Sequence, residues 1–256
     1  GLGVEVLPLI WLRMASALPF YLLVGWLSWR RMSARPAAAV VLRAFVIGLL
    51  GYYLSSLLDL YGLQYVSAQF ERLVLYAYPS LVVILGIVLF GQPFRRAILL
   101  PLAITYAGLA LMYGHDLAAA GSAGHGQQLL FGSALVAGAA LTFALYLLLS
   151  KECIRIMGSL LFTSVAMTSA TIGILVQALI QAPSGNLAAV LLPDYPARIW
   201  FGILALSIAA TVLPSFLVSE AIRRIGPERT SMSGTLGPVS TSLLAVIFLG
   251  ESISVY

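Results

Sequence analysis

The sequence predicts an all-α membrane protein, a polytopic helical bundle, and three observations support this fold class. Of the 256 residues, 61% are hydrophobic and only 9% are charged, whereas a soluble domain carries about 25% charged residues. The mean hydropathy is +1.02. Apolar runs of about 20 residues, long enough to span a bilayer as a helix, follow one another along the chain. These runs are continuous rather than alternating with polar residues, which excludes a membrane β-barrel.

The apolar runs are separated by Pro, Gly and Arg residues, which mark helix ends in a sequence. The first run ends before Arg30 and Arg31, for example, and the seventh begins after Pro196. We therefore expect eight helices, in chain order at residues 6–28, 39–61, 67–90, 95–114, 129–150, 157–180, 197–221 and 228–250. The two longest connections, residues 115–128 and 181–196, are rich in Gly, Pro and other small residues, as loops are.

Positive charge is distributed unevenly between the two ends of these helices. Eleven of the 14 Lys and Arg residues lie beside one set of alternate loops, and Arg198 alone lies beside the other set. Basic residues beside short loops stay cytoplasmic. We therefore expect the first helix to enter from the outside and both long loops to lie outside a bacterial cytoplasmic (inner) membrane. The remaining two, Arg13 and Arg72, fall inside predicted helices.

The chain contains one phrase twice, as AYPSLVVILGIVLFGQ at residues 77–92 and as LGPVSTSLLAVIFLGE at residues 236–251. Pro79 and Pro238 lie 159 residues apart, and this offset aligns two helices of each half without a gap. The helices left without a partner indicate a parent of two five-helix repeats, of which this chain shows the middle eight helices. Because five is odd, the second repeat is inverted relative to the first, an arrangement common in transporters.

The expected domain boundaries follow from this duplication. A first repeat at residues 1–114 would lack its first helix, an external linker would cover residues 115–128, and a second repeat at residues 129–256 would lack its last helix. The chain does not begin with Met, so we expect its numbering to start inside a longer parent chain.

The five-plus-five plan, the phrase P…LLAVIFLGE at residues 238–251 and the preceding SEAIRRIGPERTS at residues 219–231 resemble the EamA-type branch of the drug/metabolite transporter superfamily. The resemblance covers essentially the whole chain, and it departs at Gln92, where the family phrase usually has Glu, and at Tyr76 and Tyr78. It implies a secondary transporter, not an enzyme, that moves small metabolites such as amino acids, usually outward. The implied pathway is lined mainly by helices of the two inner pairs.

Candidate transport residues are concentrated in the helix at residues 67–90. Four polar side chains recur there at spacings of three and four and so share a face, namely Gln69, Arg72, Tyr76 and Ser80. Adjacent residues of a helix point about 100° apart, so Glu71 and Arg72 are not expected to neutralise each other. A charge inside a membrane is costly, so each needs another partner.

Our hypothesis is that Glu71 or Asp59 neutralises Arg13 near the outer end of the bundle, and that the remaining charge contacts a charged group of the substrate. Snorkelling at the interface, with a purely structural ion pair, is the alternative. Glu71 is also a candidate proton carrier, because burial favours the neutral form of a carboxyl group.

Tyr53, Tyr76 and Tyr78 are candidates for the pathway because a phenol offers both apolar contact and a hydroxyl, although aromatic residues in membrane helices more often pack or anchor. Pro79 and Pro238 each remove a backbone donor and should kink their helices near the middle of the membrane. In the functional interpretation, the carbonyl groups freed by each kink face a cavity.

The second copy of the phrase follows small residues, among them Ser233, Thr235 and Gly237. Small residues let helices approach closely, while the two hydroxyl groups offer an alternative role as a wall of the pathway. Glu220 lies close to the arginine pair that follows it, where we expect either a cytoplasmic ion pair that acts as a gate or a solvated carboxylate.

Other classes of function lack the residues that they need. Cys153 is the only cysteine, and His115 and His125 both fall in an external loop, so we expect no metal, no cofactor and no catalytic dyad. No Gly-rich phosphate loop is present, and the cations are too scattered for nucleic acid. A passive channel remains open, and an intramembrane enzyme is the weaker alternative. The expected partners are a small-molecule substrate, the lipid bilayer and protons, with the protein a monomer or a homodimer.

Overall fold

The structure is a computed structural model that describes residues 6–93, 103, 106–107, 111, 123–181 and 195–234. Every element among these residues is a helix, and five helical stretches are long and apolar enough to cross a membrane. Large apolar side chains point outward from the bundle, including Val88, Ile180 and Phe201, which are 72%, 79% and 74% exposed. The predicted fold class, an all-α polytopic bundle, is confirmed.

The first two predicted helices are present with small shifts of their ends. Helix α1 (Val6–Arg31) continues one turn beyond the predicted end, through the basic residues. The second is built from α2 (Ala38–Gly48), the π-helical η1 (Leu49–Leu54) and α3 (Ser55–Gly62). A π-helical turn widens a helix locally and is frequent at functional sites.

The helix predicted at residues 67–90 is broken into α4 (Ala68–Leu75) and α5 (Tyr78–Phe90). Pro79 is in the first turn of α5, where its missing N–H leaves no hydrogen bond unmade. The kink expected at this proline is therefore present, as a break between two helices. Ser67 caps the start of α4, because its Oγ accepts the backbone N–H of Phe70 at 3.2 Å.

Helix α7 (Ala123–Gln181) consists of two arms joined at Gly158, whose φ of 77° and ψ of 159° are accessible essentially only to glycine. Two predicted boundaries are therefore wrong. Residues 123–128 are helical rather than part of the external loop, and residues 151–156 continue the first arm. The charges that suggested a break, at Glu152 and Arg155, form an ion pair within the helix and do not end it.

The last described elements are α9 (Ala197–Ser207), the π-helical η3 (Ile208–Val212) and α10 (Leu213–Gly234). Gly226, with φ of 84° and ψ of 164°, divides α10 into two helices in the way that Gly158 divides α7. The predicted separation of residues 197–221 from the helix starting at 228 is therefore present. The structure describes only isolated residues of the helix predicted at 95–114 and nothing beyond Gly234.

The two π-helical segments occur at equivalent positions of the two halves. Leu49 begins η1 and Ile208 begins η3, and these starts are 159 residues apart, the offset that separates the repeated phrases. Gly48 approaches the backbone of Ala166 so closely that a Cβ would collide with it. Its counterpart at the same offset, Ser207, donates from Oγ to the carbonyl oxygen of Arg13 at 2.9 Å. Matching local geometry at matching positions supports a duplication.

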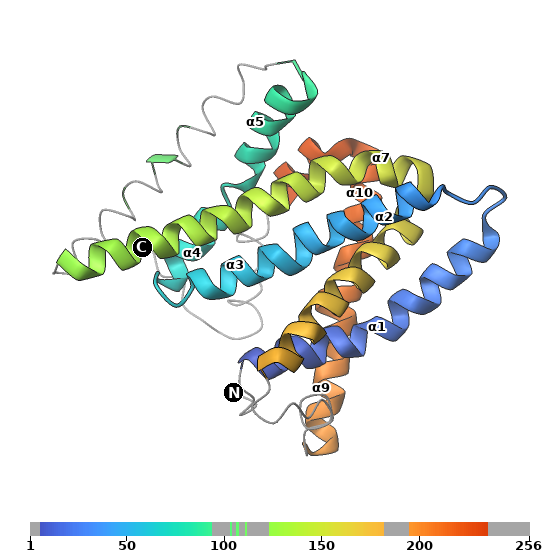
Figure 1. Ribbon diagram of the computed structural model, residues 1–256, viewed down its shortest axis with the longest axis horizontal. Helices are drawn as coiled ribbons and strands as arrows, with labels where there is room; N and C mark the ends of the chain where they lie inside the picture. Colours follow the sequence, from blue (N-terminus) through green and yellow to red (C-terminus); the bar gives the residue numbers. More distant parts are fainter. Residues whose placement is uncertain are drawn as a thin grey trace, which may run out of the picture.

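Helix α7 is the centre of the bundle, with α1, α2, α3, α4, α5 and α10 packed against it. Figure 1 shows its two arms as a V, the green first arm beside α2 and α3 and the yellow-to-orange second arm beside α1. Three apolar clusters fill the contacts, and the largest joins both arms of α7 to α2, α5 and α10 around Tyr146 and Phe162, which are fully buried.

Candidate transport site

A cavity of about 760 Å³ lies between α3, the broken helix α4/α5 and the first arm of α7. It brings together five residues that the sequence singled out, from three separate stretches of the chain. Its lining is Ser55, Ser56, Asp59, Glu71, Arg72, Leu75, Tyr76, Tyr78, Ala140 and Phe143. The lining combines carboxyl, guanidinium, hydroxyl and aromatic groups around one volume.

The break between α4 and α5 gives this cavity its shape. Tyr76 lies in the two-residue interruption, Tyr78 is the first residue of α5, and both reach the cavity. Helix α3 is fixed against α7 on the other side, because Ser55 Oγ donates to the carbonyl oxygen of Ala139 at 2.9 Å. A discontinuous helix that ends inside a membrane protein is tolerated where it lines a cavity.

The carboxyl groups of Asp59 and Glu71 lie within hydrogen-bonding reach of each other. Glu71 is buried, with 8% of its surface exposed, and Asp59 Oδ1 is a buried atom without a hydrogen-bond partner. Arg72 is the one cation that lines the cavity, and its side chain is exposed. Glu71 and Arg72 therefore share the cavity, while the direct partner of Glu71 is Asp59.

The predicted neutralisation of Arg13 by Glu71 or Asp59 is not present. Arg13 lies on α1 against α9, and its Nε is a buried atom without a hydrogen-bond partner. It does not line the cavity. The two carboxyl groups face each other across α3 and α4, an arrangement that spacing along either helix alone does not reveal.

Tyr78 connects the cavity to the second half of the chain. Its hydroxyl donates to the carbonyl oxygen of Ser231 on α10 at 3.1 Å, and a Cβ added to Gly234 would collide with the same hydroxyl. The ring packs edge-on against Phe143, with the ring centroids 5.2 Å apart. The absence of a side chain at Gly234 therefore leaves room for the hydroxyl of this tyrosine.

A stack of aromatic rings lies beneath the cavity, on the side of the arginine-rich helix ends, and sequence reasoning missed it. Tyr146 is fully buried, stacks on Phe143 at 5.8 Å and meets Tyr52 edge-on at 4.9 Å. A Cβ on Gly51 would collide with the Tyr146 ring, so η1 and α7 are in close contact here. These rings pack between the cavity and that end of the bundle.

The other predicted site residues lie apart from the cavity. Tyr53 packs in the cluster of α1 and the second arm of α7, over Gly173. Ser80 is half-buried on α5 and does not line the cavity. Ser233 is exposed and its hydroxyl donates to the carbonyl oxygen of Arg229 in its own helix, at 2.9 Å. Pro79 is buried behind the break. Three further predicted residues, Thr235, Gly237 and Pro238, lie outside the described residues.

Glu220 forms the ion pair that its sequence neighbours indicated. Its Oε2 accepts from Arg223 Nε at 2.7 Å, and its Oε1 accepts from Arg224 Nε at 2.6 Å. Ser159, at the start of the second arm of α7, also donates from Oγ to Glu220 Oε2 at 2.6 Å. The carboxylate therefore ties α10 to α7 at the arginine-rich end.

The described residues contain no group of three or more His, Cys, Asp or Glu side chains placed to hold a metal ion. The free Cys153 is buried, at the end of the first arm of α7. Its buried position indicates that this side chain packs in the apolar core.

Residues 2–114 and 130–256 each match the EamA-like transporter family. The chain is also similar to a protein of Bacillus subtilis (strain 168) named "Uncharacterized transporter YcbK", with 30% identity over 206 residues. The aligned region covers 80% of this chain and 63% of that relative. The chain therefore spans somewhat less than two thirds of the length of the relative.

Proposed function

The chain belongs to the EamA-like transporter family, and from this membership we propose that it is a secondary transporter that carries a small amphipathic metabolite, such as an amino acid, by alternating access. Membership of this family, together with the long apolar helices, makes the chain an integral membrane protein and supports a role in transport. The transport activity, the substrate, the direction and the mechanism are the parts that we propose.

One observation carries the proposal, namely a cavity that places Arg72, the Asp59 and Glu71 carboxyl groups and aromatic rings around one volume. An amino acid carries a carboxylate and an ammonium group beside an apolar or aromatic side chain. Arg72 is suited to bind the carboxylate of such a solute, and the acidic pair is suited to bind its ammonium group. The rings of Tyr76 and Phe143 are suited to pack against its side chain. Each group of the solute would thus meet its complement within a cavity large enough for it.

The membrane and the orientation are also part of the proposal. We place the chain in a bacterial inner membrane with its arginine-rich helix ends in the cytoplasm. The cavity then lies in the outer half, with the rings of Tyr52, Phe143 and Tyr146 beneath it. The Glu220 cluster ties α10 to α7 at the same cytoplasmic end. This is the arrangement of an outward-facing state whose cytoplasmic side is closed.

Alternating access fits a chain of two repeats of opposite orientation, residues 1–114 and 129–256. Two such repeats can exchange conformations and so open their shared central site to either side of the membrane in turn. The matching π-helical segments of η1 and η3 support such a pair. In this scheme the latch at Glu220 and the ring stack open while the outer half closes. A homodimer is compatible with this scheme, and so is a monomer.

Proton coupling is proposed for the Asp59 and Glu71 pair. Two carboxylates this close repel each other strongly, and a single shared proton relieves the repulsion while keeping the hydrogen bond. A solute ammonium that enters the pair would displace that proton. Export of one solute would then be coupled to uptake of one proton.

The test begins with a thermal-stability screen of the purified protein against amino acids, nucleosides, sugars and amines. The best stabiliser is then used in a counterflow assay in proteoliposomes. A carrier accumulates labelled solute against its gradient while unlabelled solute leaves, whereas a passive channel, the principal alternative, does not. We expect counterflow, and its absence with a solute that binds would reject alternating access. Hydrolysis or modification of the solute would instead indicate an enzyme.

A further inference from the structure

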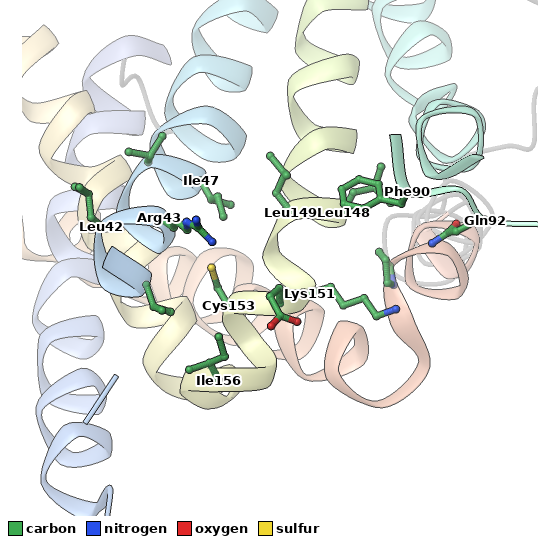
Figure 2. Close-up of a pocket in the computed structure, with 14 residues that line it drawn as sticks. Leu42, Arg43, Ile47, Phe90, Gln92, Leu148, Leu149, Lys151, Cys153 and Ile156 are labelled. Atoms are coloured by element: carbon green, nitrogen blue, oxygen red, sulfur yellow. The ribbon is translucent and has the colours of Figure 1, made fainter. Parts of the chain in front are cut away.

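A second cavity, of about 820 Å³, lies at the arginine-rich end of the bundle. It is bounded by α2, by the end of α5, by the first arm of α7 and by Pro227 in α10, and it shares no residue with the transport cavity. Figure 2 shows Arg43 on one side of it and Phe90 and Gln92 on the other, with the end of the first arm of α7 between them. We call it the α2/α7 groove.

The groove carries positive charge that the residues described in the structure do not neutralise. Arg43 and Lys151 are exposed and line it, and in Figure 2 Arg43 reaches toward Cys153 while Lys151 extends on the side of Phe90 and Gln92. Glu152 is the one acid among its lining residues, and Arg155 binds that carboxylate with Nε donating to Oε2 at 2.9 Å. Neither groove cation takes part in an ion pair among the described residues.

Exposed apolar side chains form the wall of the same groove. Leu42 and Val46 on α2 are 63% and 54% exposed, and Phe90 and Leu149 add further exposed apolar surface. Two unpaired cations beside such a wall match a phospholipid, whose phosphate would meet the cations and whose acyl chains would cover the wall. A soluble anion would satisfy the cations and leave the wall uncovered.

From this complementarity we propose that the α2/α7 groove binds an anionic phospholipid of the cytoplasmic leaflet, with Arg43 and Lys151 as the headgroup ligands. The orientation is the one given above, with this end of the bundle in the cytoplasm. The site is separate from the transport cavity, so its failure would leave the transport proposal untouched. Basic sites between membrane helices on this face are suited to anionic headgroups.

The experiment compares phosphatidylglycerol with phosphatidylcholine in titrations of the purified protein in detergent, followed by native mass spectrometry and by thermal stability. We expect phosphatidylglycerol to bind more tightly to the unaltered protein. In the Arg43→Gln/Lys151→Gln variant its affinity should fall roughly fivefold for each cation removed. The matched control is Arg30→Gln/Arg35→Gln, which loses one charge in the last turn of α1 and one just beyond it, where each arginine lies over a tryptophan ring. This control should bind phosphatidylglycerol as the unaltered protein does.

Three results would overturn the proposal. These are equal binding of the two lipids, equal loss of affinity in the two double variants, and competition by glycerol phosphate as effective as by phosphatidylglycerol, which would make the site one for a soluble anion. A charge-conserving pair, Arg43→Lys/Lys151→Arg, keeps the test decisive if the neutral variant does not fold. This pair should retain the preference for phosphatidylglycerol, and loss of the preference would count against the proposal.

Discussion

At the scale of single residues, the proposed proton site makes Glu71 the side chain with the clearest expected effect. Glu71→Gln keeps the size of the side chain and its ability to hydrogen-bond to Asp59, which lies within reach, but cannot exchange a proton. We expect the variant to bind solute and to perform counterflow, while transport no longer responds to a pH gradient across proteoliposomes. Glu152→Gln, which removes a surface carboxylate paired within its own helix, is the control. An unchanged pH response in Glu71→Gln would reject the proton site.

Tyr78 is one of the residues that form a hydrogen bond between the two halves of the chain. Tyr78→Phe removes the donor to the Ser231 carbonyl oxygen and keeps the ring on Phe143. We expect a loss of about 0.5–1.5 kcal/mol in the free energy of unfolding, which is a fall of about 2–4 °C in Tm for each kcal/mol lost. Tyr65→Phe, which alters an exposed ring in the turn that follows α3, should leave Tm unchanged. Equal Tm values for the two variants would contradict the assigned role of the Tyr78 hydroxyl.

At the scale of the elements, two glycines determine where the long helices turn. Gly158 and Gly226 have φ of 77° and 84°, and their φ and ψ together occupy a region that a side chain strongly disfavours. Gly158→Ala and Gly226→Ala should each cost about 1–3 kcal/mol of stability, measured as a fall in Tm. Gly202→Ala is the matched control, because Gly202 lies inside α9 with open space around its Cα. A cost for Gly202→Ala as large as for the other two would refute this explanation of the turns.

The elements also show what a sequence can and cannot predict. The break at Pro79 was predictable because proline lacks the donor that a continuous helix needs. The continuation of the helix through Glu152 was not predictable, because charged residues are found both at the ends of helices and in loops. The π-helical turns of η1 and η3 carry no composition signal of their own. Asp59 and Glu71 were both singled out, but their pairing depends on how α3 packs beside α4, which only tertiary structure determines.

At the scale of the whole molecule, the Glu220 cluster is expected to favour the state that is closed toward the cytoplasm. Glu220→Gln weakens the contacts with Arg223, Arg224 and Ser159 together. Exposed ion pairs contribute about 0.2–1 kcal/mol each, so the outward-facing fraction should fall by a few-fold, and the apparent affinity for outer solute falls with it. Titrations of solute against Tm measure that affinity. Glu152→Gln, whose ion pair joins no second element, should not change it, and an equal effect of both variants would exclude a latch.

The aromatic stack explains why the cavity itself was only partly predictable. Ser56, Phe143 and Ala140 line it, yet none of the three was among the candidate residues that the sequence singled out. Phe143 and Tyr146 lie in an apolar run in which any aromatic residue fits a packing role equally well. Their function as the floor of the cavity depends on the V formed by the two arms of α7 (Figure 1).

The central claim is that the cavity between α3, α4 and α7 holds the transported solute. Cys153 is the only cysteine, so a Cys153→Ser background allows a single reporter to be placed in the cavity as Ser56→Cys. The measurement is the labelling rate by a membrane-impermeant thiol reagent in proteoliposomes, with and without the solute that shows counterflow, and with Leu63→Cys beyond the end of α3 as the control. The account predicts that the solute slows labelling at position 56 and leaves position 63 unaffected. Labelling at position 56 that proceeds at the same rate under saturating solute would contradict it.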